Sequence, residues 1–217
     1  MNGDSLLSKM WARICTWWPI KITSTAVGMT AFFIAYFWIQ RNPFFPITAV
    51  PLTALDRMIA FRPEALLVYA SLWPYVSLAP ALLTDRRVFV SYWIAAAIIS
   101  IIGLGIFFLW PTDVLWSDVN WSQHPSFLFL KSIDAQANAC PSLHVAFAVF
   151  TAMWLNRLLR EMNSGGWARV LNWFWCIGIL YSTMAVRQHA ALDVYCGAVL
   201  GVVAGAVQMH TLRSVKV

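Results

Sequence analysis

Charged side chains are scarce in this chain, and that scarcity excludes a soluble domain. Asp, Glu, Lys and Arg make up only 11 % of the 217 residues, whereas 60 % are hydrophobic. Soluble domains carry about 25 % charged residues. Apolar stretches of about 20 residues recur along the chain, each long enough to cross a hydrocarbon core of about 30 Å. The sequence therefore predicts an all-α, polytopic membrane helix bundle of about six transmembrane helices.

The chain also lacks the cysteine spacing of a disulfide framework or a zinc site. Its four cysteines are scattered, and no two of them form a Cys-x-x-Cys motif. The net charge is +6, but the basic residues lie in short clusters between apolar runs, which is typical of membrane topology signals. We therefore expect the membrane, and no nucleic acid, as the partner of this chain.

Six apolar spans organise the chain after an N-terminal segment, 1–20, which we place in the cytoplasm. They form a single membrane domain over 21–217. Pro74 and Pro80 interrupt the second span and are expected to kink it. The predicted spans are 21–39, 64–84, 88–110, 141–159, 169–187 and 191–211.

The distribution of Lys and Arg gives an orientation. With the N-terminus inside, ten of the 15 basic residues lie in inner segments and five in outer segments, in line with the positive-inside rule. The loop 111–139 and the turn before the sixth span then face outside. Aromatic residues in that loop, such as Trp116 and Trp121, predict either a cap over a site or a loop that simply packs on the bundle. We expect a multi-pass protein of a cell membrane, a bacterial inner membrane, with its site facing the periplasm or exterior.

The first polar motif is Cys-Pro-Ser-Leu-His, residues 140–144, at the start of the fourth span. Proline suits the first position of a helix, and the free N–H groups and dipole of a first turn favour an anion. Ser142 adds a hydroxyl donor, and His144 can protonate a leaving alkoxide as a general acid. By itself, this string also fits an interfacial polar residue at a helix start.

The second motif is Gln-His-Ala-Ala-Leu-Asp-Val, residues 188–194, at the start of the sixth span. His189 and Asp193 are four residues apart, so on a helix they share one face. A carboxylate beside an imidazole fixes its tautomer and stabilises its cation, which leaves the other ring nitrogen free for nucleophilic attack. A structural ion pair that caps the sixth helix explains the same two residues equally well.

Together, Pro-Ser-x-His at one helix start and His-x-x-x-Asp-Val-x-x-Gly at another resemble the type 2 phosphatidic acid phosphatase superfamily. The stretch from Ser182 to Gly197 is most similar to its inositol phosphorylceramide synthase-like branch. The resemblance covers the phosphatase-like core, about 50–212. It implies that His189 attacks phosphorus to form a phosphohistidine, that Asp193 supports it, that His144 serves the leaving group, and that no metal is needed.

Two basic elements of that superfamily are missing from this chain. No Lys-x6-Arg-Pro motif lies between 110 and 139, and Thr183 stands where the phosphatases place an arginine six residues before the nucleophilic histidine. Synthase-like members share such losses. Other groups must then bind the phosphate, and our candidates are Arg187 first, Lys131 second and the Ser142 hydroxyl.

The sequence thus predicts an integral membrane lipid phosphatase or lipid phosphotransferase that acts on a lipid phosphate at the extracytoplasmic leaflet. Water would resolve the phosphohistidine in a phosphatase, and an alcohol headgroup would resolve it in a transferase. The missing basic motifs favour a transferase, while the compact size favours a phosphatase. Two alternatives stay open: a non-enzymatic carrier or partner subunit on the same scaffold, and a metal-dependent hydrolase with His144, His189 and Asp193 as zinc ligands.

Overall fold

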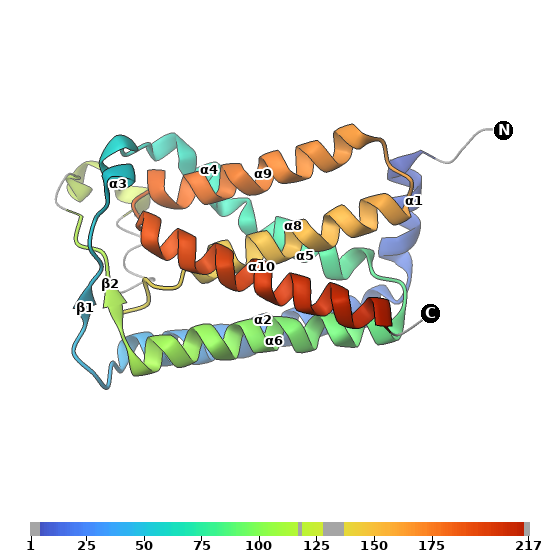
Figure 1. Ribbon diagram of the computed structural model, residues 1–217, viewed down its shortest axis with the longest axis horizontal. Helices are drawn as coiled ribbons and strands as arrows, with labels where there is room; N and C mark the ends of the chain where they lie inside the picture. The colour runs from blue at the N-terminus through green and yellow to red at the C-terminus, as the bar shows by residue number, and fades with distance from the viewer. Residues whose placement is uncertain (1–4, 117–118, 128–136, 215–217) are drawn as a thin grey trace.

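The structure is a computed structural model that describes residues 5–116, 119–127 and 137–214. Its long helices run side by side, and both chain termini lie at the same end (Figure 1). The long helices are α2 (Trp18–Arg41), α6 (Arg86–Leu109), α8 (Leu143–Glu161), α9 (Gly166–Ala185) and α10 (Ala191–Ser214). The shorter helices are α1 (Leu6–Cys15), α3 (Ala54–Met58), α4 (Leu66–Ala70), α5 (Leu72–Leu82), and the 3-10 turns η1 (Pro63–Ala65) and η2 (Trp121–Gln123).

A short pair of strands joins two connections at the end opposite the termini. Strand β1 (Thr48–Ala49) follows α2, and strand β2 (Thr112–Asp113) follows α6. They pair in parallel, with Thr48 opposite Thr112 (Figure 1). The pairing was not predicted from the sequence, because two-residue strands carry no periodic pattern.

The predicted helical membrane bundle is confirmed, while the number of spans stays a prediction. Among the described residues, four helical segments are long and apolar enough to cross a membrane: Trp18–Arg41, Pro63–Leu82, Arg86–Leu109 and Ala191–Leu212. The predicted fourth and fifth spans are α8 and α9, which have 19 and 20 residues and pack beside α10 (Figure 1). Both helices contain polar residues, including Arg157 and Arg160 in α8 and Asn172 in α9.

The second predicted span is broken once, at Ser71, instead of being kinked at two prolines. Helix α4 ends at Ala70, and α5 begins at Leu72. Pro74 explains the position of the break, because its nitrogen cannot donate to the carbonyl four residues earlier and its ring crowds that carbonyl. Pro80 lies within α5, which continues to Leu82.

Helix α1 lies within residues 1–20, whose cytoplasmic location stays a prediction. Ser5 caps it by accepting a hydrogen bond from the amide of Ser8 at 3.2 Å. The Lys9 ammonium donates to the carbonyl of Met162 at 3.1 Å, while Leu7 and Trp11 are 77 % and 68 % exposed. The helix therefore combines polar contacts to the bundle with exposed apolar side chains, as helices at membrane surfaces do.

The core of the bundle is formed around α8, which packs against α5, α6, α9 and α10. Glycines recur at every fourth position of α10, at Gly197, Gly201 and Gly205. A Cβ atom at Gly197 would lie 2.3 Å from the carbonyl oxygen of Ser142, and one at Gly201 would lie 2.5 Å from that of Ala146. These small residues let the backbones of α8 and α10 approach closely, which brings the starts of both helices together.

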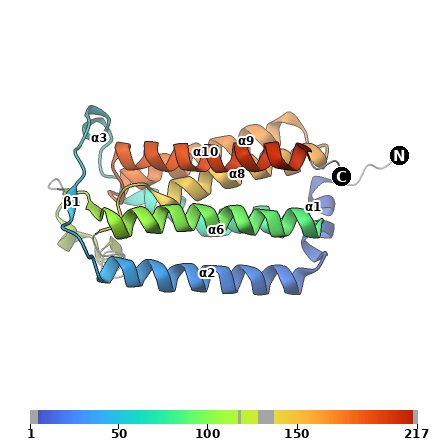
Figure 2. The same cartoon turned by 60° about the horizontal axis from the view of Figure 1, so that its bottom comes forward.

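Helix α2 lies on the outside of the bundle. Figure 2 shows it along one side, next to α6, and its described contacts with other helices include α5 and α6. The buried side chains of α2 are Lys21, Tyr36 and Gln40. Side chains of α2 also line a cavity inside the bundle.

Candidate active site

His144 and His189 come together from the two sequence motifs. The Nε2 atom of His189 lies 3.3 Å from the Nδ1 atom of His144, and the ring centroids are 5.5 Å apart. His144 is the second residue of α8, and His189 lies in the turn between α9 and α10. Both predicted histidines therefore lie at the same end of the bundle, opposite the termini (Figure 1).

A chain of hydrogen bonds fixes the tautomers of these two rings. The Nδ1 atom of His189 lies 3.0 Å from the carbonyl oxygen of Ala139, and because a carbonyl only accepts, this nitrogen carries a proton. In neutral His189 the Nε2 atom then has a lone pair, to which the Nδ1–H group of His144 donates. The nucleophilic nitrogen that the sequence predicted is therefore the one that faces His144.

Tyr69 completes this chain from α4. Its hydroxyl lies 2.9 Å from the Nε2 atom of His144, and its ring packs on the imidazole with centroids 5.1 Å apart. A hydroxyl can donate to neutral His144 and accept from the protonated form. Tyr69 is 5 % exposed, so this partner serves His144 in both protonation states without water.

Asp193 lies close to His189, although the two do not share a helical face as expected. His189 precedes α10, which begins at Ala191. The Oδ2 atom of Asp193 is 3.8 Å from Nδ1 of His189 and accepts the amide hydrogen of Ala190 at 2.8 Å. The tautomer of His189 is thus held by the Ala139 carbonyl, and the fully buried carboxylate of Asp193 acts at slightly longer range.

The turn that carries His189 is built on the carbonyl of Thr183. The amides of Gln188 and His189 donate to this carbonyl at 3.0 and 3.2 Å, and the amide of Arg187 donates to Met184 at 3.0 Å. This pattern is that of a Schellman motif, which ends many helices. Thr183 stands where the related phosphatases have an arginine, and here its backbone orients the histidine.

Ser142 lies at the junction between the two motifs. Its amide donates to the carbonyl of Asp193 at 3.0 Å, and its Oγ atom accepts the amide hydrogen of Val145 at 3.3 Å. Ser142 is fully buried. Its hydroxyl therefore caps α8, and its predicted contact with phosphate stays a prediction.

Arg187 is buried against Trp116 and Asp56, which lie in connections between the long helices. It has a left-handed backbone, with φ of 60°, and its guanidinium lies over the ring of Trp116, with Cζ 4.2 Å from the centroid. The Nη1 atom lies 3.5 Å from the carbonyl oxygen of Asp56. Arg187 is 5 % exposed. Its predicted role as a phosphate ligand stays a prediction, and Lys131, the second candidate, lies outside the described residues.

Asp56 was not predicted from the sequence as part of this region. Its Oδ2 atom accepts from the amide and hydroxyl of Thr53, both at 2.7 Å, and its Oδ1 atom accepts from the amide of Ala191 at 2.7 Å. One carboxylate therefore caps both α3 and α10. The Thr53-x-x-Asp56 spacing signals a helix start, but it carries no sign of the distant second contact.

A cavity of about 430 Å³ adjoins the histidine pair and extends from it along the bundle, toward the end that holds the termini. We call the end at the histidines its upper end. Polar side chains gather at its upper end: Tyr36, Tyr69, Asn138, His144 and His189. The side-chain amide of Asn138 donates to the hydroxyl of Tyr36. Below them, the walls consist mainly of aromatic and aliphatic side chains from α2, α5, α6 and α8. The site thus has a polar mouth and an apolar interior.

The described parts of the loop between α6 and α8 contribute to this end of the bundle. We expected this loop either to cap the site or simply to pack on the bundle. Trp121 and Phe127 pack on Phe61, with ring centroids 5.7 and 5.2 Å away. His124 lies 5.0 Å from the same ring. Asn138 and Ala139, at the end of the loop, reach the site. Residues 117–118 and 128–136 lie outside the described part of the chain.

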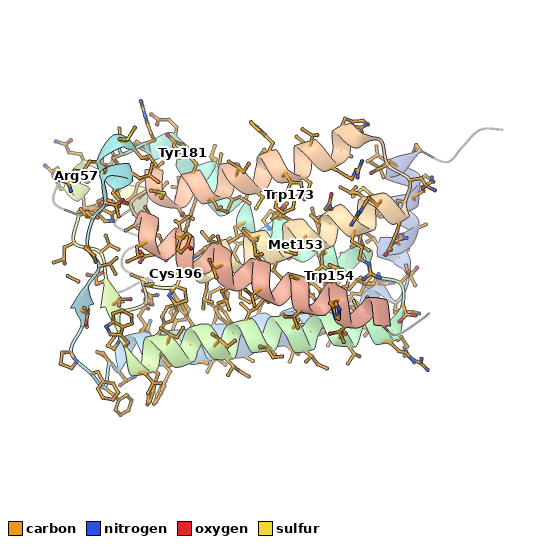
Figure 3. All side chains as sticks on the ribbon, viewed as in Figure 1. Arg57, Met153, Trp154, Trp173, Tyr181 and Cys196 are labelled. Atoms are coloured by element: carbon orange, nitrogen blue, oxygen red, sulfur yellow. The ribbon has the colours of Figure 1, made fainter. Side chains whose placement is uncertain are left out.

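Cys140 lies beside the buried carboxylate. Burial and the neighbouring Cys196 thiol and Asp193 carboxylate raise the pKa of Cys140 to about 12. Cys196 lies at the site end of α10 (Figure 3). Because the thiolate is the reactive form of cysteine, Cys140 is an inert packing residue at neutral pH.

A comparison with known protein families decides the family question. Residues 86–215, more than half of the chain, match the PAP2 superfamily. The chain belongs to the PAP2 superfamily. Members of this superfamily act on phosphate esters, and the matched region contains both histidine motifs. No curated protein and no solved structure matches the chain.

The PAP2 match confirms the broader resemblance, and the placement in the inositol phosphorylceramide synthase-like branch stays a prediction. Tyr69, Tyr36 and Asp56 lie before the matched region. Sequence reasoning missed these three because isolated Tyr and Asp residues carry no motif. In the described part of the chain, no group of three or more His, Cys, Asp or Glu side chains is placed to hold a metal ion.

Proposed function

We propose that this member of the PAP2 superfamily is an integral membrane lipid phosphatase or lipid phosphotransferase with His189 as its nucleophile. One observation supports this best: the same cavity is lined by the paired histidines at its mouth and by apolar side chains below. A phosphate group can bind at the mouth while a hydrocarbon part occupies the interior. With the N-terminus in the cytoplasm, the mouth faces the extracytoplasmic leaflet.

The first chemical step uses the lone pair on Nε2 of His189. This nitrogen forms a bond to phosphorus while the bond between phosphorus and the lipid oxygen breaks. The leaving oxygen takes the Nδ1 proton of His144 in its protonated form, while the Nε2–H group of His144 donates to the Tyr69 hydroxyl. The products of this half-reaction are a lipid alcohol and phosphohistidine.

The second step resolves the phosphohistidine. A water molecule, or an alcohol headgroup in a transferase, loses its proton to neutral His144 as its oxygen attacks phosphorus. The bond between phosphorus and nitrogen breaks, which restores His189 and releases phosphate or a new phosphate ester. Throughout, the Nδ1–H group of His189 donates to Ala139, and the Asp193 carboxylate stabilises the positive charge of the substituted ring.

Substrate binding requires the histidine pair to separate. At 3.3 Å, the Nδ1–H group of His144 occupies the lone pair of His189, so no phosphorus atom fits between them. A nucleophile and an acid on opposite sides of a phosphoryl group must each lie about 3 Å from their target atoms. We therefore propose that His144 turns away from His189 as the phosphate enters.

The charge of the phosphate group needs partners of its own, because phosphoryl transfer depends on electrostatic stabilisation. We propose Arg187 for this role, with Lys131 and the Ser142 hydroxyl as further ligands. Arg187 already lies two residues from His189, held against Trp116.

Trapping the covalent intermediate tests this proposal. Purified protein is mixed with a lipid phosphate that carries radioactive phosphorus, then quenched in alkali, in which phosphohistidine survives. We expect label on wild-type protein and none on His189→Ala, with His144→Ala retaining the fold and accumulating little label because protonation of the leaving group fails. Equal labelling of wild type and His189→Ala would contradict the assignment. No label and no product with any lipid phosphate would favour the non-enzymatic alternative.

A further inference from the structure

We infer that the cavity below the histidine pair is a binding site for one hydrocarbon chain of the substrate, and that Gly28 and Trp93 set the length of chain that fits. This inference rests on the proposed function for the identity of the ligand. It goes beyond that function by naming how many chains enter the protein and what limits their length.

The depth of the cavity matches one leaflet of a membrane. On α2 its lining runs from Phe37 to Thr25, which corresponds to roughly 18 Å at a rise of about 1.5 Å per residue. On α6 it runs from Phe107 to Tyr92, or roughly 22 Å. Half of a hydrocarbon core is about 15 Å thick. A chain that fills this cavity therefore has the length of an ordinary membrane-lipid chain.

The width of the cavity fits one chain. A volume of about 430 Å³ spread over roughly 18 Å leaves a mean cross-section of about 24 Å². Carbon atoms pack about 4 Å apart, so one extended chain needs roughly 20 Å² and two need roughly 40 Å². A second chain of the same lipid would have to remain in the bilayer.

The chemistry of the walls agrees with this occupant. The hydroxyls of Ser77 and Ser100, which line the middle of the cavity, donate to carbonyls of their own helices at 2.9 and 3.0 Å. They therefore present little polarity to a ligand. Ala31, Ala97 and Ile101 also line the cavity and are exposed, so the cavity borders the outer surface of α2 and α6.

Gly28 and Trp93 form a narrow contact near the lower end. A Cβ atom at Gly28 would lie 2.7 Å from Cζ3 of Trp93, so the indole ring rests directly on the α2 backbone. Both residues line the cavity. Any larger side chain at position 28 must displace the ring or fill the space, which shortens the room for a chain. Removal of the indole should lengthen that room.

The test uses alkyl phosphonates, whose carbon–phosphorus bond resists hydrolysis, so that binding is read without turnover. A hexadecyl phosphonate with a photoreactive diazirine on its last carbon is bound to the wild type in mixed micelles, irradiated, and mapped by mass spectrometry. We expect crosslinks around Gly28 and Trp93, and crosslinks near Asn138 and His144 when the diazirine lies next to the phosphonate. Crosslinks from the terminal diazirine on the exposed surface of α9 would overturn the inference.

Variants then test the limit on length. We expect Gly28→Leu to weaken binding of the hexadecyl compound about tenfold, the size of effect that steric fit in an apolar pocket produces, while decyl phosphonate binds as in the wild type. Trp93→Ala should improve binding of a docosyl phosphonate. This variant tests the limit on chain length even if Gly28→Leu does not fold. Ala26→Leu adds the same bulk on the exposed side of α2 and should leave both affinities unchanged. Identical length dependence in all four proteins would refute the role of Gly28 and Trp93.

The two proposals fail separately. If the crosslinks appear as expected but no lipid phosphate is turned over, the chain site stands and the proposed activity is wrong. If phosphate is released while the crosslinks and chain-length preference are absent, the activity stands and the chain site is wrong.

Discussion

Nε2 of His189 and Nδ1 of His144 lie 3.3 Å apart, so the nitrogen assigned to attack is covered by the side chain assigned to protonate the leaving group. The contact depends on three further groups. Ala139 orients the ring of His189, and Tyr69 orients the ring of His144. The glycines of α10 let α8 and α10 approach closely. Tyr69 and the glycines can be changed separately by substitution, whereas the Ala139 group is a backbone carbonyl.

Tyr69→Phe should alter the pH dependence of the reaction. The hydroxyl accepts a hydrogen bond from protonated His144, and hydrogen bonds to charged groups are the stronger ones. Its loss disfavours the protonated acid, so the high-pH limb of the kcat profile should move to lower pH, and kcat at neutral pH should fall about tenfold or more. Tyr75→Phe is the matched control, because Tyr75 is buried and bonds to Asn172 Oδ1 at 2.8 Å. An unchanged pH profile in Tyr69→Phe would show that Tyr69 only packs.

Gly197→Ala should push apart the two histidine motifs at the starts of α8 and α10. The new Cβ atom would meet the Ser142 carbonyl oxygen at 2.3 Å, a backbone atom that cannot move independently. We expect a loss of about 1–3 kcal/mol in stability and an even larger relative loss of activity. At Gly105 no neighbouring atom lies within 4 Å, so Gly105→Ala should keep or raise the thermal midpoint. Both variants are compared by thermal unfolding in detergent, and equal behaviour would contradict the close-packing explanation.

Arg187→Gly should distinguish the role of the Arg187 backbone in the turn from the role of its charge. Glycine adopts a positive φ without strain, so the turn before His189 is retained while the guanidinium over Trp116 is lost. If Arg187 binds phosphate, kcat/KM should fall about a hundredfold, as for loss of one strong electrostatic contact. Arg57→Gly serves as control, because Arg57 is exposed at the same end of the bundle (Figure 3). A loss of stability without a change in kcat/KM would make Arg187 structural.

Cys140 should resist thiol reagents despite its position beside the site. Its pKa is raised to about 12, so at pH 7 to 8 the thiol is almost entirely protonated, and reactivity should rise only as the pH approaches that value. Cys15 is exposed and should be alkylated first. Mass spectrometry after brief iodoacetamide treatment measures both, and rapid modification of Cys140 at pH 7 would contradict its burial.

Much of the bundle could be predicted from the sequence because apolar length is a strong signal. The predicted spans 88–110 and 191–211 correspond closely to α6 and α10. The break at Ser71, the helix α1 and the β1–β2 pair were missed, since each depends on a few residues or on contacts between distant segments.

The candidate site could be predicted only as far as motifs extend. His144, His189 and Asp193 come from short strings with helical spacing, and the structure places them together. The partners that orient them are a backbone carbonyl at Ala139 and a tyrosine at position 69, and neither residue type at these positions signals a site. Every residue has a backbone carbonyl, so the sequence gives no sign of this one's role and only the fold shows it.

Phosphate release tests the central claim most directly. A panel of lipid phosphates in detergent is given to the wild type and to His189→Ala, with EDTA present throughout. We predict that the wild type releases phosphate from at least one lipid phosphate, or transfers it to an added alcohol, that His189→Ala does neither, and that EDTA makes no difference. Undiminished release by His189→Ala, or release that EDTA abolishes, would contradict a metal-independent reaction through His189.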